Sequence, residues 1–396
     1  MSQGVLSPSG PAASGARACP RLARLTLHEF RNYPALTLDL PQEAPIVVLT
    51  GANGAGKTNL LEAISLLSPG RGLRQARLPE LLRTGGEGPW RVAARLVSDA
   101  GERELGTGLQ AESERRQVRI DRRNAQPAEL AAVVAVLWLT PQMDRLFLES
   151  AGGRRRFLDR LAFLLDPEHA RRVAGYERVL RERGRLLADA PASPADSAWL
   201  AALESQAAEL GVAIAAGRLT AVEQLNTALA QAAEPDFPAA LLAVEGTVEG
   251  WLASMPALAA EARLAEALAL ARPKDAATGG SLVGPHRSDL VVSDRRRAVP
   301  AARCSTGEQK ALLLAIVLAE ARLVAGLRGL PPLLLLDEVS AHLDQGRRAA
   351  LCQRLLAHGG QVWLTGTEPA LFDALKGRAC ALAIANGRAR LEEWAV

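Results

Sequence analysis

The sequence predicts an α/β fold in which both ends of the chain contribute to a parallel sheet and a largely helical block is inserted between them. Two apolar runs support this prediction. Pro45–Thr50 and Pro331–Leu336 are continuous, bounded by turn residues, and typical of strands buried on both faces of a sheet. Between them, leucine and alanine recur at helical intervals with few strand signals.

The N-terminal elements follow from local pattern. Residues 22–40 alternate apolar and polar side chains around Arg31-Asn32-Tyr33-Pro34, which predicts a hairpin. The apolar run 45–50 leads into a glycine-rich segment and then into Asn59–Ile64, which has helical spacing. Strand, glycine loop and helix, in this order, are what a phosphate-binding loop requires. A second hairpin is expected within the alternating region 90–125, over residues 116–124.

The middle of the chain predicts helices over 154–187, 193–233 and 251–271. Ser193 is the expected N-cap of the second helix, with Pro194 at its first position. Proline- and glycine-containing segments, among them 272–280, are expected to separate the helices. A third strand of the sheet is expected at Gln361–Thr365.

Length and composition exclude several classes of protein. A chain of 396 residues fits two or three domains of roughly 100–200 residues each. No stretch approaches the run of about 18 apolar residues that spans a bilayer, which excludes an integral membrane protein. The four scattered cysteines, without a CxxC pair, favour a reducing cytosol. Residues 1–17 lack the pattern of a secretory signal and are expected to form a flexible tail.

The charge balance indicates little by itself. Forty-seven basic and forty-three acidic residues give a net charge of +4, which only weakly favours a polyanionic partner. Arginines make up all but four of the basic residues. The lysines are therefore informative, and two of them, Lys57 and Lys310, fall inside motifs.

The segment Gly51–Thr58 matches the pattern GxxxxGK[ST], and each residue type has a physical reason. The loop backbone wraps phosphate oxygens, Lys57 reaches the β and γ phosphates, and the Thr58 hydroxyl ligates Mg²⁺. The sequence therefore predicts an ATP site with Mg²⁺. The loop residues expected to contact the nucleotide are Gly51, Ala52, Asn53, Gly54, Ala55, Gly56, Lys57 and Thr58.

The strand Leu333–Leu336 delivers Asp337 and Glu338 at its carboxyl end, where α/β sheets bind ligands. Asp337 is expected to hold Mg²⁺ through water, and Glu338 to polarise the attacking water as a general base. An ordinary strand ending in a solvated acidic turn is the alternative interpretation. The phosphate-binding loop elsewhere in the chain favours the catalytic interpretation of Asp337 and Glu338.

The segment Cys304–Lys310 precedes a helix expected over 311–323. Ser305 and Glu308 have the spacing of a plain capping box, which is the alternative to a functional reading. The order of the motifs decides between them: phosphate loop, Thr140-Pro141-Gln142, helical insertion, SxGxQ, the Asp337-Glu338 strand, and Ser340–Asp344. This series resembles that of the ABC ATPase superfamily.

The resemblance implies an ABC-type P-loop ATPase head with a largely helical inserted second domain. It implies a catalytic and metal-binding role for Gln142, and nucleotide contacts for Ser305, Gly307, Gln309 and Asp344. The expected division is a tail at 1–20, the first half of the ATPase domain at 21–140, the helical insert at 141–275, and the second half at 276–396.

Within that superfamily the chain resembles a narrower family, RecF, an SMC-like DNA replication and repair ATPase. Phe30-Arg31-Asn32-Tyr33 and Gly284–Leu290 are its most specific motifs, because nucleotide binding needs neither. The matching segments are Leu27–Tyr33, Gly51–Glu62, Gly70–Arg74, Arg154–Asp159, Gly284–Leu290, Ser305–Lys310 and Leu335–Asp344. Two features depart from the family: the N-terminal tail, and residues 364–367, which supply no switch histidine and leave Thr365 or Thr367 for that position.

The family resemblance implies a cytoplasmic protein in which two protomers enclose two ATP molecules, each phosphate loop facing the partner's segment 305–310. It implies ATP-dependent binding to DNA, slow DNA-stimulated ATP hydrolysis, and action with RecO and RecR to load RecA at single-strand gaps. No membrane partner is implied.

The sequence alone does not decide which arginines contact DNA, and it leaves two alternative functions. Arginines at 71, 74 and 77, and at 115, 116, 119, 122 and 123, either neutralise DNA phosphates or form a solvated surface. Arg154–Arg156 predicts the start of a helix more strongly than a contact with DNA. The alternative functions are the nucleotide-binding subunit of an ABC transporter and a DNA-binding scaffold without catalysis. A long-armed SMC protein is excluded, because the segment between the ATPase halves shows no sustained heptads.

Overall fold

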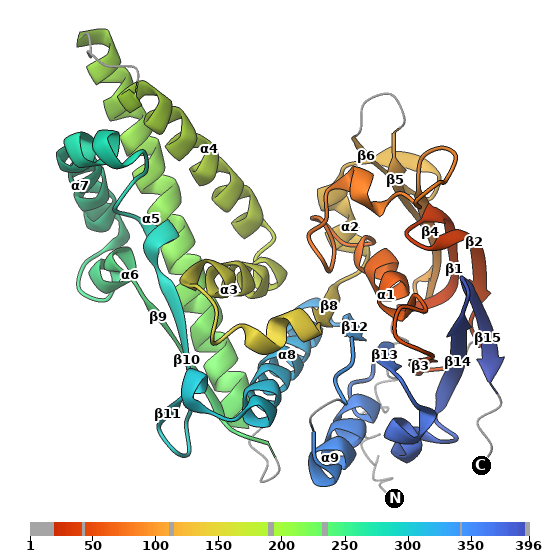
Figure 1. Ribbon diagram of the computed structural model, residues 1–396. Coiled ribbons are helices and arrows are strands. Elements are labelled where there is room, and N and C mark those ends of the chain that lie inside the picture. The colour runs from red at the N-terminus through yellow and green to blue at the C-terminus, as the bar shows by residue number, and fades with distance from the viewer. Residues whose placement is uncertain are drawn as a thin grey trace, which may run out of the picture.

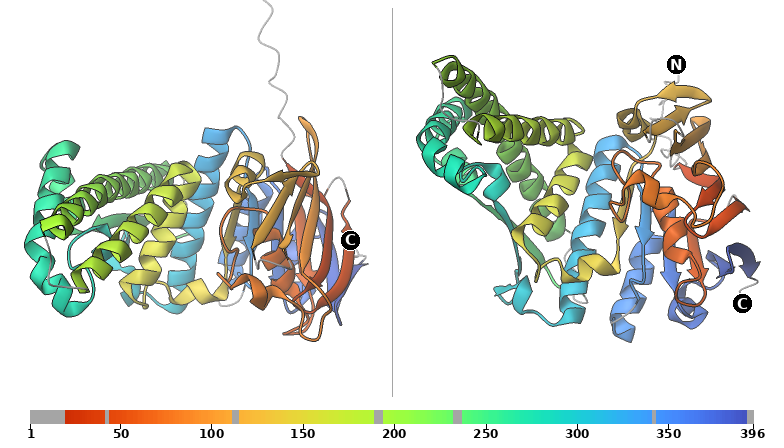
Figure 2. Two further views of the ribbon diagram at one scale, coloured as in Figure 1. Left: turned by 90° about the horizontal axis from the view of Figure 1, so that it is seen from above. Right: turned by 45° about the horizontal axis from the view of Figure 1, so that its top comes forward.

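The computed structural model describes residues 20–41, 44–110, 115–188, 194–231, 237–340 and 343–392. The expected tail, apart from Pro20, lies outside these residues, as do the expected cap Ser193, Cys19 and Ala341-His342. In Figures 1 and 2 a lobe of long helices stands beside a lobe containing two larger sheets, and helix α8 (Thr306–Arg328) lies between them. No helix in the described ranges is both long and apolar enough to cross a bilayer.

The central sheet is formed by both ends of the chain. Its order is β15-β14-β3-β13-β12-β8, and every pair is parallel except β14 with β15. The strands are β3 (Ile46–Thr50), β8 (Val136–Leu139), β12 (Leu333–Leu336), β13 (Val362–Gly366), β14 (Ala379–Ala385) and β15 (Arg388–Glu392). The three strands expected from apolar runs are confirmed, and β8, β14 and β15 were not predicted.

A second sheet is wholly antiparallel, in the order β2-β1-β4-β5-β6-β7. Its strands are β1 (Arg21–Phe30), β2 (Tyr33–Asp39), β4 (Arg91–Ser98), β5 (Gly101–Leu109), β6 (Arg116–Ile120) and β7 (Arg123–Ala125). Both predicted hairpins are therefore confirmed. The first places Asn32 at a turn beside the central sheet, and Asp121 and Arg122 form the second turn with positive φ.

The central sheet has a core on each face. Along β3, Val47 and Leu49 join the core shared with the antiparallel sheet and α1 (Lys57–Ser65), whereas Val48 joins the core shared with α8. Because successive side chains of a strand point to opposite faces, a continuous apolar run is what such a double-sided position demands. Helix α9 (Gln345–Leu356) also contributes to the α8 side.

The helical lobe consists of α3 (Ala151–Leu165), α4 (Glu168–Ala188), α5 (Pro194–Gln231), α6 (Thr247–Leu252) and α7 (Ala257–Thr278). Arg183 of α4 is buried and ties three helices together: it donates to Glu204 of α5, and to Asp275 and the Leu268 carbonyl of α7. Such a buried cation is tolerated because its donors are satisfied. The shorter segments are η1 (Leu78–Leu81), η2 (Pro127–Glu129), α2 (Leu130–Val133), η3 (Pro141–Arg145), η4 (Pro285–Arg287), η5 (Ala301–Arg303) and η6 (Pro369–Leu375).

Several expectations for the middle of the chain were wrong in detail. The helix expected over 251–271 is divided between α6 and α7, with residues 253–256 outside both. The helix expected over 154–187 is two helices, α3 and α4, separated at Asp166-Pro167. Helix α7 continues through Pro273 to Thr278, where a break was expected; Pro273 is exposed, so water can satisfy the carbonyl that it leaves unpaired.

A further error concerns a strand inside the block expected to be helical. β9 (Ala240–Glu245) pairs with β10 (Asp289–Asp294), which also pairs with β11 (Val299–Pro300) in a small antiparallel sheet. The sequence of β9 is rich in alanine and leucine and carries little strand signal of its own. Pairing with β10 determines its conformation, which is a tertiary effect.

Candidate functional site

The phosphate loop connects β3 to α1, as the motif predicts. Gly56 has a φ of 114°, a left-handed value, and any Cβ there would lie 2.6 Å from both Asn32 Nδ2 and Tyr33 Oη. Glycine is therefore required for conformation and for space. The loop backbone is held from outside: Asn32 Nδ2 donates to the Ala55 carbonyl at 3.1 Å, and Tyr33 Oη donates to the Gly56 carbonyl at 3.1 Å.

The loop has the donors that an anion needs. In the described part of the chain, the backbone N–H groups of Gly54, Gly56, Lys57 and Thr58 have no protein acceptor. They lie at the start of α1, where helix N–H groups are unpaired and the helix dipole favours negative charge. Lys57 is buried and its Nζ donates to the carbonyls of Gly51 (2.6 Å) and Ala52 (3.0 Å). The loop therefore fits a phosphate group.

Acidic and hydroxyl side chains from distant parts of the sequence meet beside the loop. Thr58 Oγ1 donates to Asp337, with distances of 2.9 and 3.1 Å to its two carboxylate oxygens. Thr365 Oγ1, at the end of β13, donates to Asp337 Oδ1 at 2.7 Å. Hydroxyl and carboxylate oxygens are the ligands that Mg²⁺ prefers. Thr58 and Asp337 are therefore placed to share a cation.

Glu338 is half-buried directly after Asp337, and its backbone has an unusual conformation. Its φ is 50°, a left-handed value that non-glycine residues rarely adopt. Its N–H donates to Thr365 Oγ1 at 2.8 Å, and its carbonyl accepts from Lys310 Nζ at 2.9 Å. Burial lowers the pKa of Lys57, and the charges of Glu338 and Asp337 oppose this shift.

Gln142 lies on the same edge of the sheet. It is exposed in η3, directly after β8, the neighbour of β12; Leu139 and Leu336 are paired residues of these strands. Because parallel strands end at one edge, Gln142 follows β8 where Asp337 and Glu338 follow β12. The three predicted polar residues thus leave neighbouring strands at one edge.

The signature segment, Ser305–Lys310, begins α8 and forms a true capping box. Glu308 N–H donates to Ser305 Oγ, and Ser305 N–H donates to Glu308 Oε2 at 2.8 Å. Hydrogen bonds from Ser305 and from Arg297 lower the pKa of Glu308 to about 2. Ser305 is exposed and Gly307 half-buried. Across the described residues, no hydrogen bond or ion pair joins residues 305–309 to the phosphate loop of the same chain.

Two predicted nucleotide contacts have structural partners. Gln309 is buried, and its amide donates to the Cys304 carbonyl at 2.9 Å, so it faces the protein interior and not the surface that Ser305 occupies. Asp344 is exposed and caps α9 by accepting from Arg347 N–H at 2.8 Å. Neither arrangement could be read from motif order alone.

The Phe-Arg-Asn-Tyr motif supports the phosphate loop, a role that the sequence alone did not reveal. Besides Asn32 and Tyr33, Arg31 forms two hydrogen bonds, of 2.7 and 2.8 Å, with Glu62 of α1. Arg74 bonds the same carboxylate at 3.0 Å. The two arginines neutralise a glutamate whose side chain is fully buried.

The second specific motif, Gly284–Leu290, joins the helical lobe to β10. His286 Nδ1 is 2.9 Å from Tyr176 Oη, and Ser288 Oγ donates to Glu249 at 2.7 Å. Arg154 forms a bidentate pair with Asp289, at 2.6 and 2.8 Å. Burial lowers the pKa of His286, which therefore favours the neutral ring. The motif ties α3, α4 and α6 of the helical lobe to the small sheet, and Arg154 is occupied by this role.

The arginines of the β6–β7 hairpin do not form one free basic face. The Arg116 guanidinium points inward and donates to the carbonyls of Leu66, Ser68 and Gly70, after α1. Arg122 pairs with Glu104 across the sheet. Arg115, Arg119 and Arg123 are exposed, as are Arg71 and Arg77.

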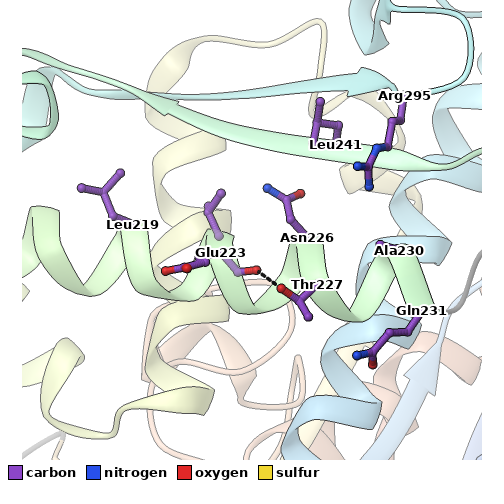
Figure 3. Close-up of a pocket in the computed structure, with 9 residues that line it drawn as sticks. Leu219, Glu223, Asn226, Thr227, Ala230, Gln231, Leu241 and Arg295 are labelled. Atoms are coloured by element: carbon purple, nitrogen blue, oxygen red, sulfur yellow. Dashed lines mark hydrogen bonds between the residues drawn. The ribbon is translucent and has the colours of Figure 1, made fainter. Parts of the chain in front are cut away.

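A hollow without any of these motif residues lies in the helical lobe. A groove of about 700 Å³ is lined by residues of α5 and by Leu241 and Arg295 (Figure 3). Asn226 closes the edge of β9 there, donating to the Leu242 carbonyl and accepting from its N–H. No motif residue lines this groove.

Comparisons with known proteins agree with the fold and the motif order. The family model described as the RecF/RecN/SMC N terminal domain matches residues 21–377. A protein of Mesorhizobium japonicum named DNA replication and repair protein RecF is 49% identical over 370 residues, covering 92% of this chain and 96% of that relative. The chain belongs to the RecF family. This membership sets aside the ABC transporter alternative.

Solved RecF structures share the fold. One, described as the recombination mediator protein RecF-ATPrS in the RecFOR pathway, has a TM-score of 0.83 at 21% identity and covers 96% of this chain and all of that one. The RecF-ATP structure has a TM-score of 0.80 at 22% identity, with 94% and 99% coverage. The RecF family chain is thus an α/β protein of the ABC-type ATPase fold. Its described cysteines, Cys304, Cys352 and Cys380, are buried free thiols.

Proposed function

We propose that this RecF family chain is an ATP-dependent DNA-binding ATPase of recombinational repair and replication restart, which dimerises on ATP. The bond between Thr58 and Asp337, with the charge of the adjacent Glu338 acting on Lys57 of the loop, carries the proposal. A loop with free N–H donors, next to carboxylates at a strand end, is suited to a nucleotide triphosphate and a cation.

The reaction assigned to the site is ATP hydrolysis. The oxygen of a water molecule bonds to the γ-phosphorus while the bond from that phosphorus to the β,γ-bridging oxygen breaks, and ADP leaves with that oxygen. Glu338 takes the proton of the water, and Gln142 orients the water. Mg²⁺, held by Thr58 and Asp337 with Gln142 nearby, would neutralise phosphate charge. Lys57 exchanges its two loop carbonyls for phosphate oxygens.

A second copy completes the site. Ser305 and Gly307 lie at the start of a 23-residue helix, and within the described residues neither is hydrogen-bonded to its own phosphate loop. Their accessible helix end favours an anion brought by a partner surface. We assign the γ-phosphate of the partner's ATP to Ser305 and Gly307. In this assignment Gln309 and Asp344 hold the starts of α8 and α9.

The names of the relatives support the biological role. RecF proteins are described as DNA replication and repair proteins, and a solved RecF is placed in the RecFOR pathway. We therefore assign DNA, RecO and RecR as cytoplasmic partners, and RecA loading at single-strand gaps as the outcome. The predicted arginines that are exposed and have no ion pair in the described structure are the ones offered to the DNA backbone: Arg71, Arg77, Arg115, Arg119 and Arg123.

Sedimentation tests this function directly. The chain is centrifuged alone, with ATP, with ADP, and with ATP plus gapped duplex DNA. We expect a dimer with ATP, a monomer with ADP, and binding of the ATP dimer to DNA that weakens steeply with added salt. A chain that binds ATP but stays monomeric, or whose DNA binding ignores the nucleotide, would contradict the proposal.

A further inference from the structure

Lys310 connects three parts of the site that belong to separate sequence motifs: the start of α8, Glu338 and η3. Its side chain is 3% exposed, and it is the last residue of the signature segment Ser305–Lys310, in the first turns of α8. Its Nζ donates to the Glu338 carbonyl at 2.9 Å and to Asp144 Oδ2 at 3.2 Å. Asp144 belongs to η3, the short helix that also carries Gln142.

The contact with Glu338 reaches a strained point of the backbone. Glu338 has a φ of 50°, and its peptide groups are held on both sides, by Thr365 Oγ1 at the N–H and by Lys310 Nζ at the carbonyl. A non-glycine residue stays in this region only when its surroundings fix it there. Movement of Lys310 therefore changes the position of the Glu338 backbone.

Filling space in the protein interior does not explain a lysine at position 310. Burying an ammonium group is unfavourable unless its donors are satisfied, and an apolar side chain would fill the same space without that penalty. Lys310 instead makes two directed hydrogen bonds, one to each catalytic segment of its own chain. The charge thus specifies where these segments lie relative to α8.

We infer that Lys310 is a positioning residue that couples the two ATP sites of the dimer. This inference rests on the proposed function. The signature segment of one chain touches the ATP held by the partner, whereas Glu338 and Gln142 of that chain act on its own ATP. Lys310 lies between them, so closure of the signature segment on one nucleotide sets the catalytic groups that act on the other.

Mixed dimers separate this role from a direct contact with the partner's nucleotide. Each dimer contains one Glu338→Gln chain, so only one of its two sites hydrolyses ATP. The two chains carry different affinity tags, through which the mixed dimer is isolated. In the first dimer, Lys310→Met is in the chain with intact Glu338. In the second, it is in the Glu338→Gln chain. We expect turnover in the first dimer to be roughly tenfold lower than in the second, with a similar KM for ATP.

The opposite order of rates would show that Lys310 acts on the partner's nucleotide, and equal rates would show that it positions nothing; either result overturns the inference. Lys310→Arg, which keeps the donor, is expected to restore part of the turnover in the first dimer. If Lys310→Met does not fold, Asp144→Asn replaces it and the same asymmetry is expected. A wild-type chain that neither dimerises nor hydrolyses ATP contradicts the proposed function, whereas an active dimer without asymmetry contradicts only the coupling.

Discussion

The hydroxyl of Thr58 donates to the carboxylate of Asp337 across 279 positions of the sequence, at 2.9 Å to Oδ2. This contact joins the phosphate loop to the acidic end of β12, and Thr365 fixes the same carboxylate from β13 at 2.7 Å. The two ends of the chain therefore form a single site. Of the two threonines predicted for the switch position, Thr365 bonds to Asp337 and Glu338, and Thr367 is exposed.

Replacing Lys57 tests the nucleotide site. Lys57→Ala removes the cation assigned to the β and γ phosphates, so the affinity for ATP is expected to fall at least tenfold, about 1.4 kcal/mol or more. Titration with a fluorescent ATP analogue measures the change. Exposed Lys274 on α7 supplies the matched control, Lys274→Ala, which should bind like the wild type. Wild-type affinity in Lys57→Ala would mean that the nucleotide binds elsewhere.

Glu338→Gln separates chemistry from binding. The amide keeps the size of the side chain but cannot accept a proton from water, so hydrolysis is expected to drop roughly 100-fold while ATP still binds. Single-turnover measurement of phosphate release checks the rate, with Glu223→Gln, an exposed change in the helical lobe, as the control. Unchanged hydrolysis in Glu338→Gln would show that another group activates the water.

Tyr33→Phe tests whether the Phe-Arg-Asn-Tyr motif shapes the phosphate loop. The change removes the hydrogen bond to the Gly56 carbonyl and leaves the ring in place. We expect ATP affinity to weaken by about 0.5–1.5 kcal/mol. The other tyrosine, Tyr176, also loses one buried hydrogen bond on substitution by Phe but lies in the helical lobe. Equal ATP affinities for the two variants would argue against a supporting role for Tyr33.

Glu320 predicts a dependence of stability on pH. It is fully buried on α8, and burial raises its pKa to about 8, with nearby Arg160 opposing the shift. The folded state therefore binds this proton more tightly than the unfolded state. Its stabilising contribution is complete below the ordinary carboxyl pKa, near 4.5, and is lost as the pH rises through about 8.

Glu320→Gln has no proton to lose, so its unfolding free energy should vary less between pH 6 and 8. In the wild type this carboxyl accounts for a loss on the order of 2 kcal/mol over that interval. Chemical denaturation at several pH values measures both slopes, and Glu223→Gln serves as the exposed control. Parallel slopes for wild type and Glu320→Gln would show that Glu320 is ionised in the folded protein.

The sequence predicts the loop Gly51–Thr58 and the pair Asp337-Glu338 because each is a local pattern attached to a buried strand. It does not predict the support given by Asn32 and Tyr33, since these contacts join residues 23 positions apart in separate elements. The sequence also does not predict that the Gln309 side chain points into the protein interior. Helix α8 is buried on nearly all sides between the lobes, so its apolar pattern does not identify an outer face.

The central claim is that two chains form each ATP site, and light scattering of Ser305→Arg tests it most directly. The substitution places a bulky cation on the exposed start of α8, where the partner's nucleotide must close, and leaves the phosphate loop intact. Ser254→Arg, an exposed change in the helical lobe, is the matched control. The account predicts that Ser305→Arg binds ATP but remains monomeric with ATP, while Ser254→Arg dimerises. A Ser305→Arg chain that dimerises normally on ATP, or that loses ATP binding as severely as Lys57→Ala, would contradict the shared site.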